Sequence, residues 1–205
     1  MSPDETENPS PSITDRSDGE IASQDEIIEG VEGIELSPSE HQRIKDLVNG
    51  RELKRIKGHE RRYLVAGAGG ETGAATRREI VYDLLDSRDD PPAVATQLED
   101  FGLSPEEIRL WVRVFDILCG MATHIVAVIE DFEGGYVWEL GLLFADEYRQ
   151  KTWVLKRHYS DSDVEREKYD NGMSASHVKL LLTGSQAFEW ADVEELKEMV
   201  EIKVP

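Results

Sequence analysis

The sequence predicts an α/β fold: a three-layer sandwich with a mostly parallel sheet of four to five strands, preceded by a disordered acidic tail. Three observations predict it. Short apolar runs alternate with amphipathic segments, glycines follow two of these runs directly, and acidic and polar residues fill the first forty positions. Strands that alternate with helices pair in parallel, and the connecting helices cover both faces of the sheet.

We expect three regions along the chain. Residues 1–38 form the tail, because a segment rich in Ser, Pro, Asp and Glu cannot bury enough apolar surface to offset its chain entropy. Residues 39–62 form a short helix, which begins after Ser37, and a basic linker with six Lys or Arg. That basic cluster could bind an anion or pack against the tail, or it could simply be solvated. Residues 63–205 form the α/β domain.

The elements of the domain follow from apolar periodicity and from capping signals. Pro91-Pro92 separates the first helix from a second apolar run, 93–98, which a helical turn would also fit. Ser104-Pro105-Glu106-Glu107 has the features of a helix start: a cap, then proline, then acids. The expected strands are 63–66, 93–98, 123–129, 152–155 and 188–190, and the expected helices are 75–87, 105–119, 136–149, 174–183 and 191–200.

Composition and charge narrow the functional classes. The net charge of −20 repels nucleic acid and anionic membranes, so we expect neither as a partner. No apolar run is long enough to span a bilayer and the N-terminus does not resemble a signal peptide, which predicts a cytoplasmic protein. The single Cys119 excludes an internal disulfide. Many acids with few lysines are typical of a salt-rich, halophilic cytoplasm, although an ordinary acidic protein fits as well.

The first candidate site is the glycine-rich loop that follows the first strand. Gly67, Gly69 and Gly70 would let the backbone approach a phosphate at the next helix, with Thr72 beside it. Thr72 stands where the dinucleotide fingerprint requires glycine, and the acids available for a ribose are Glu99 and Asp100. The alternative is a tight turn that binds no ligand.

The second candidate site follows the strongest predicted strand. Gly134 and Gly135 turn the chain, and Glu139 comes in the first turn of the next helix among apolar neighbours. A partly desolvated carboxylate is suited to act as a base or nucleophile, and Asp131 or Glu133 could supply a second carboxylate for glycosidic chemistry. The simpler account is that Glu139 complements the helix dipole.

The third candidate site is the end of the strand 152–155. Arg157, with Lys156 and His158, would suit a phosphate or carboxylate. The alternative is ion pairing with the acids that follow at 161, 163 and 165. The five histidines have no metal-ligand spacing, so we expect no metal site.

The run from Val114 to Leu155 contains a helix, a strand that ends in acid, Gly-x-x-x-Glu-Leu-Gly, a helix and a strand. It resembles the nucleoside 2-deoxyribosyltransferase-like group and is similar to TIR-like nucleotide-binding domains, which share a flavodoxin-like architecture. The resemblance covers about 63–173 and implies that Glu139 is the nucleophile toward the sugar. Asn171-Gly172-Met173 loosely matches an Asn-x-Met element that often reaches a neighbouring subunit's site, which implies a homo-oligomer.

These observations give one functional hypothesis and two alternatives. The first is N-glycosidic bond chemistry, as a hydrolase or glycosyl transferase, on a nucleoside, nucleotide or NAD-like ligand. It requires no cofactor, and NAD or a nucleotide would be the substrate or ligand. The second is a non-catalytic nucleotide-binding or sensor domain. The third is an interaction module that uses the acidic tail.

Overall fold

The computed structural model describes residues 36–104, 107–134, 136–170 and 172–205. The predicted disordered tail therefore lies outside the described residues, apart from its last three positions. Leu36 is buried, and helix α2 (Pro38–Val48) begins after Ser37. The Ser37 hydroxyl accepts a hydrogen bond from the Glu40 amide while the Glu40 carboxylate accepts one from the Ser37 amide, as a capping box requires.

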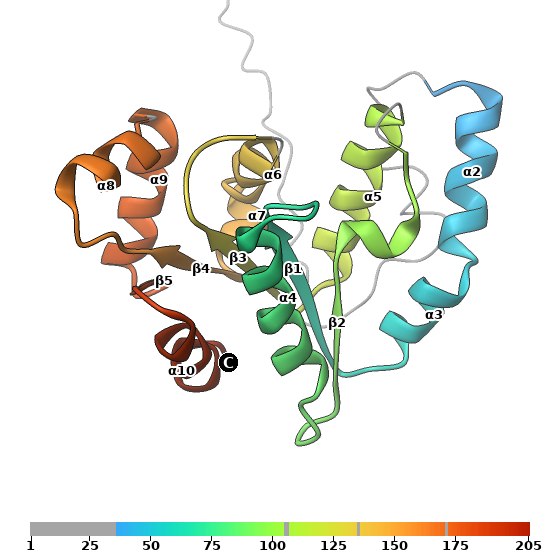
Figure 1. The fold of residues 1–205 in the computed structure, drawn as a ribbon. Helices are drawn as coiled ribbons and strands as arrows, with labels where there is room; N and C mark the ends of the chain where they lie inside the picture. The colour runs from blue at the N-terminus through green and yellow to red at the C-terminus, as the bar shows by residue number, and fades with distance from the viewer. Residues whose placement is uncertain (1–35, 105–106, 135, 171) are drawn as a thin grey trace, which may run out of the picture.

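The predicted α/β fold is confirmed, with a flavodoxin-like sheet of five parallel strands in the order β2-β1-β3-β4-β5 (Figure 1). The strands are β1 (Arg61–Gly67), β2 (Ala93–Thr96), β3 (His124–Ile129), β4 (Thr152–Arg157) and β5 (Ala187–Trp190). In register, Gly67 at the end of β1 lies opposite Val128 of β3.

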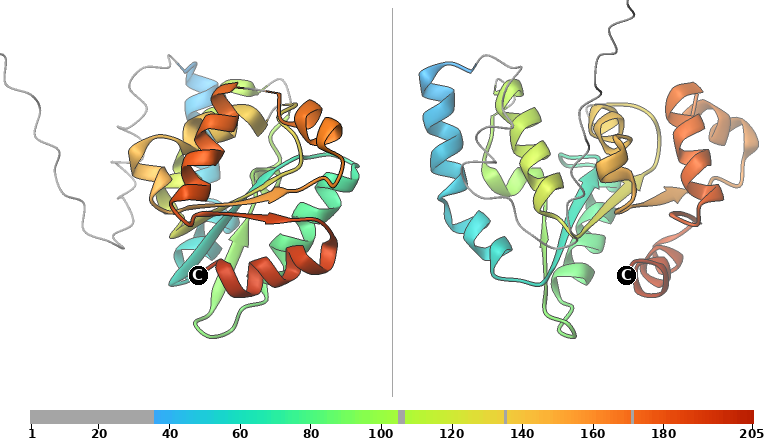
Figure 2. Two further views of the ribbon diagram at one scale, coloured as in Figure 1. Left: turned by 90° about the vertical axis from the view of Figure 1, so that its left-hand side faces the viewer. Right: turned by 180° about the vertical axis from the view of Figure 1, so that it is seen from behind.

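Helices cover both faces of this sheet, as a parallel sheet buried on two sides requires. Helices α4 (Gly73–Asp86) and α10 (Val193–Lys203) lie on one face, and α5 (Ile108–Met121), α6 (Tyr136–Leu143) and α9 (Gly172–Thr183) lie on the other (Figure 2). Helix α2 packs against α5, and α3 (Arg51–Lys57) packs against the edge strand β2.

The two cores follow from the alternation of side chains along each strand. Tyr63 and Val65 of β1 are buried with residues of α4 and α10, whereas Leu64 and Ala66 are buried with residues of α5, α6 and α9. Both faces of β1 are apolar, which explains why the strand is a continuous apolar run rather than an alternating one.

Several predicted boundaries are wrong. The expected strand 93–98 ends at Thr96, and the chain turns into a 3₁₀ helix, η1 (Leu98–Phe101), because the Asp100 carboxylate accepts from the amide of Gln97 and the hydroxyl of Thr96. The helix expected from 105 starts at Ile108, and the helix expected over 136–149 is divided into α6 and α7 (Asp146–Arg149).

Two stretches without a predicted helix contain one. The basic linker includes α3, which buries Leu53 and Ile56, and the polar segment 158–173 includes α8 (Ser162–Lys168), which Asp161 caps. Among the described residues, no helix combines the length and the apolar character needed to cross a membrane.

Candidate functional site

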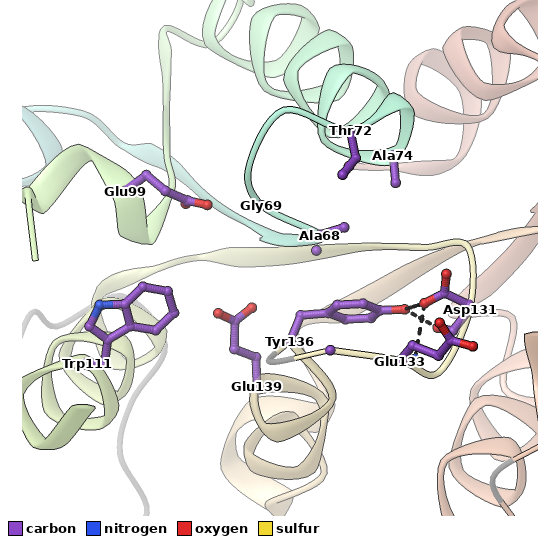
Figure 3. A pocket seen from close by; sticks show the side chains of 12 residues that line it. Ala68, Gly69, Thr72, Ala74, Glu99, Trp111, Asp131, Glu133, Tyr136 and Glu139 are labelled. Carbon is purple, nitrogen blue, oxygen red and sulfur yellow. Dashed lines mark hydrogen bonds between the residues drawn. The ribbon is translucent and has the colours of Figure 1, made fainter. Parts of the chain in front are cut away.

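A cavity of about 480 Å³ opens at the carboxyl ends of β1 and β3. These two strands flank the point where the strand order reverses, which is the usual ligand position in open α/β sheets. Figure 3 shows the loop after β1 on one side of the cavity and the loop after β3 with helix α6 on the other. The lining residues are Gly67, Ala68, Gly69, Thr72, Ala74, Glu99, Trp111, Asp131, Glu133, Gly134, Tyr136 and Glu139.

The glycines of the first loop are required by its geometry. Gly67 has a φ of 150°, and a Cβ there would lie 2.6 Å from the carbonyl oxygen of Val128. A Cβ on Gly69 would lie 2.8 Å from Oε1 of Glu99. Without these side chains the loop can approach β3 and leave room for the Glu99 carboxylate. These internal contacts are sufficient to explain why glycine occupies both positions, without a bound phosphate.

Thr72 ends this loop and starts helix α4. Its hydroxyl accepts a hydrogen bond from the Ala75 amide at 3.1 Å. The hydroxyl is thus occupied by helix capping, and the residue lines the cavity beside the helix N-terminus. This explains the threonine at the position where a dinucleotide fingerprint has glycine.

The second loop presents Asp131 and Tyr136 to the cavity. Tyr136 donates from its hydroxyl to Oδ1 of Asp131 at 2.9 Å, and also approaches the Asp131 carbonyl oxygen. Burial and the Asp131 carboxylate both raise the pKa of the Tyr136 hydroxyl, so it stays a proton donor to Asp131. Lys168 lies 3.7 Å from the other oxygen of the same carboxylate.

Glu139 points from the first turn of α6 into the cavity, and its carboxyl group lies between Trp111 and Tyr136 in the view of Figure 3. Burial raises the pKa of Glu139 to about 8, and the charge of Glu99 adds to the increase. The charge of Arg78 and a hydrogen bond from the Gly67 backbone lower it, but by less. At neutral pH the carboxyl group is therefore mostly protonated, with its ionisation close to the working range of an enzyme.

An ion pair supports the wall opposite Glu139. The Arg78 guanidinium is buried and donates to Oε1 of Glu99 at 2.6 Å, with a longer contact of 3.4 Å to the Gly67 carbonyl oxygen. Glu99 is one of the two acids that the sequence offers for a ribose, and the structure places it in the cavity. Arg78 was not expected in the site, and the available signal was its position in the helix that follows the glycine loop.

Arg157 lies outside the cavity lining. Its guanidinium pairs with Oε2 of Glu130 at 2.7 Å, and Arg77 donates two hydrogen bonds of 2.5 Å to the same carboxylate. Glu130 is buried, so two arginines compensate one carboxylate beside the start of α4. The expected phosphate site at Arg157 is thus already occupied by an internal ion pair.

Among the described residues, the ion pairing expected for this third candidate site occurs with Glu165, whereas Asp163 pairs with Arg166 and Asp161 caps α8. Lys156 pairs with both Glu165 and Glu189, and His158 lies 3.9 Å from Glu165. Within the described part of the chain, His158, Glu165 and Glu189 bring potential metal-ligand atoms within 4.8 Å of one another. The Lys156 ammonium pairs with both of these glutamates.

The structure brings six of the expected site residues into one cavity: Gly67, Gly69, Thr72, Asp131, Gly134 and Glu139. Gly70 belongs to the same loop, with a φ of 80°, but does not line the cavity. Asp100 lines a separate cavity of about 200 Å³ beside α2, where it caps η1. Gly135 and Asn171 lie outside the described residues. Trp111 was not expected, because only the packing of α5 reveals its position.

A family model described as "Family of unknown function (DUF8170)" matches residues 9–203. Neither a curated protein nor a solved structure matches the chain.

Proposed function

From the geometry of the cavity, we propose that this chain, which belongs to DUF8170, a family of unknown function, acts on N-glycosidic bonds as a hydrolase or glycosyl transferase. Its ligand would be a nucleoside, a nucleotide or an NAD-like molecule, with Glu139 as the nucleophile or stabilising carboxylate. The observation that carries this proposal is the position of Glu139: half-buried in the cavity at the topological switch point, with a pKa raised to about 8.

The chemistry needs a carboxylate that is more basic than usual. Breaking the bond between the sugar C1′ and the base nitrogen leaves positive charge on the sugar, and a desolvated carboxylate stabilises that charge strongly. Ionised Glu139 would attack C1′, and the electrons of the C1′–N bond would leave with the base. A nucleobase would take up a proton from water, whereas the nicotinamide of an NAD-like ligand leaves uncharged without one. Water, which loses a proton to solvent, or the nitrogen of a second base would then displace Glu139 from the sugar.

Asp131 would serve as the second carboxylate. It lines the same cavity, and Tyr136 fixes its orientation. With Glu99 and Glu133, four carboxyl groups line the cavity, and no Lys or Arg is among its lining residues. Such an environment favours a sugar that becomes cationic during the reaction.

Product release tests this proposal. Purified protein is incubated with a panel of nucleosides, nucleotides and NAD, and free base or nicotinamide is quantified by chromatography. We expect release by the wild type and a loss of at least a hundredfold in Glu139→Gln, which keeps the size of the side chain. The matched control is Glu198→Gln on the exposed surface of α10, which should retain full activity. Full activity in a folded Glu139→Gln protein would refute the proposal.

Binding without turnover is the second candidate function. The observation that favours it is that Glu139, with a pKa of about 8, is mainly uncharged at neutral pH in the free protein. An increase in Tm with a nucleotide or nucleoside, without any released base, would support it, because a ligand that prefers the folded state stabilises that state.

A further inference from the structure

Three neighbouring helices, α5, α6 and α9, present an apolar outer face. Seven of the nine exposed large apolar side chains of the described residues lie on them. Trp138 is 83% exposed, and Leu142 one turn later on α6 lies on the same side of that helix. Ile108 and Val112 repeat this spacing of one turn on α5, and Met173 and Leu180 lie two turns apart on one side of α9. Exposed apolar side chains that gather on neighbouring helices are typical of an interaction site.

The same face is poor in acids, although the whole chain has a net charge of −20. Helix α9 has no acidic residue, and α5 and α6 have one each. Asp116 accepts a hydrogen bond of 2.6 Å from Tyr148, and Glu139 points into the cavity. The basic residues of these helices are Arg109, Arg113 and Lys179. The face therefore suits an occupant that is both acidic and apolar.

Residues 21–35 of the same chain have this composition. They contain five aliphatic residues, Ile21, Ile27, Ile28, Val31 and Ile34, together with five acids and no base. The segment leads directly into Leu36, which is buried, and helix α2 then packs against α5. The family match begins at residue 9 and so includes the whole segment.

The segment also has the required reach. Neighbouring helix axes are about 8–10 Å apart, so the path from α2 across α5 and α6 to α9 is on the order of 30 Å. A stretch of 15 residues spans up to about 50 Å when extended. A second copy that pairs through the same face is less suitable as the occupant, because it would bring its own Arg109, Arg113 and Lys179 toward those of this face, whereas residues 21–35 bring acids.

We propose that residues 21–35 dock on the apolar face of α5, α6 and α9. The aliphatic side chains of the segment cover Trp138 and its neighbours, and the acids lie toward the basic residues of these helices. This proposal is independent of any activity at Glu139.

Cross-linking in the full-length chain tests the docking. Ile28→Cys is combined with Leu142→Cys on α6, and a short bifunctional maleimide is added; Cys119 is fully buried and does not interfere. The control pair joins Ile28→Cys to Ile202→Cys, because Ile202 is exposed on α10 at the opposite face. We expect cross-links within one chain to exceed those of the control at least fivefold. Equal yields would overturn the proposal, and cross-links between chains would identify a second copy as the occupant instead.

Amide hydrogen exchange gives an independent measurement. Replacing Ile27 and Ile28 together by Asp should accelerate exchange in 136–143 at least threefold, because the face loses its cover. Replacing Ser12 and Ile13 together by Asp adds the same two charges outside the segment and should leave this exchange unchanged. Identical exchange in the wild type and the Ile27/Ile28 variant would overturn the proposal.

Discussion

The Glu99 carboxylate raises the pKa of Glu139 across the cavity, while the Arg78 guanidinium that holds Glu99 at 2.6 Å lowers it. The site thus contains two opposing charges in addition to the burial of Glu139. Because Glu99 and Arg78 both lie outside the motif that contains Glu139, they can be changed separately.

Glu99→Gln should lower the pKa of Glu139. The substitution removes the like charge while its amide oxygen can still accept from Arg78, so the remaining positive charge favours ionised Glu139. A titration of selectively ¹³C-labelled glutamate side chains should show the Glu139 midpoint moving below about 8. Glu198→Gln on α10 should leave the midpoint in place. A midpoint that rises in Glu99→Gln would contradict this account.

The pH dependence of activity should follow Glu139. A nucleophile must be ionised, so kcat/KM should rise with pH and level off above about pH 8, the pKa of Glu139. The Glu99→Gln variant should level off at lower pH. A kcat/KM that falls as pH rises through 8 would instead assign to Glu139 the role of proton donor.

The same carboxyl group should affect stability. In the folded chain Glu139 keeps its proton up to about pH 8, whereas the ordinary pKa of a glutamate, which applies to the unfolded chain, is 4.5. The folded state therefore binds more protons in this interval, and the free energy of unfolding contributed by this group falls as the pH rises from 4.5 to 8.

Glu139→Gln removes this decrease in the free energy of unfolding. The difference in unfolding free energy between the variant and the wild type should therefore be more favourable to the variant at pH 9 than at pH 5, by on the order of 2 kcal/mol. This is less than the full pKa shift implies, because the cavity admits water. Urea denaturation at the two pH values measures the difference. Glu198→Gln should show none, and a Glu139→Gln effect that is the same at both pH values would refute the raised pKa.

The sequence predicts the fold better than the site because its signals are local. Apolar runs locate β1 and β3, and Ser37 marks the start of α2 correctly. The glycine loop at 67 and the turn before Glu139 are local signals as well, and the parallel sheet brings them to one edge. The expected division into regions at 38 and 62 stays a prediction.

The remaining features of the site depend on which strands are neighbours. Arg157 pairs with Glu130 because β3 and β4 are adjacent, although 27 positions separate the two residues. Glu99 enters the cavity because the chain turns into η1 two residues earlier than expected, while Asp100 is used as its cap. No periodicity in the sequence specifies these contacts.

Removing Glu130 should destabilise the protein strongly. The carboxylate is 6% exposed and pairs with both Arg77 and Arg157, so Glu130→Ala leaves two partly buried guanidinium groups without their acceptor. We expect a loss of about 3–5 kcal/mol in the free energy of unfolding, measured by chemical denaturation. Lys197→Ala, which breaks the surface pair with Glu194, should cost about 0.5 kcal/mol. Similar losses in both variants would show that the buried ion pairs of Glu130 stabilise the protein no more than a surface ion pair does.

Gly67→Ala should also destabilise the fold, independently of any ligand. Its φ of 150° is unfavourable for an L-residue, and the new Cβ would lie 2.6 Å from the Val128 carbonyl oxygen, which the paired strands hold in place. Strain of this kind costs about 1–3 kcal/mol, and relief of the clash must separate β1 from β3.

Two other glycines provide the comparison. Gly70 has a positive φ of 80° but open space where a Cβ would lie, so Gly70→Ala should lower the free energy of unfolding by only about 1 kcal/mol. Gly120→Ala lies in α5 with nothing within 4 Å and should gain up to about 1 kcal/mol. Thermal denaturation of the three variants should therefore rank Gly120→Ala above Gly70→Ala and Gly70→Ala above Gly67→Ala, and any other order would mean that the loop after β1 adjusts more freely than its contact with β3 implies.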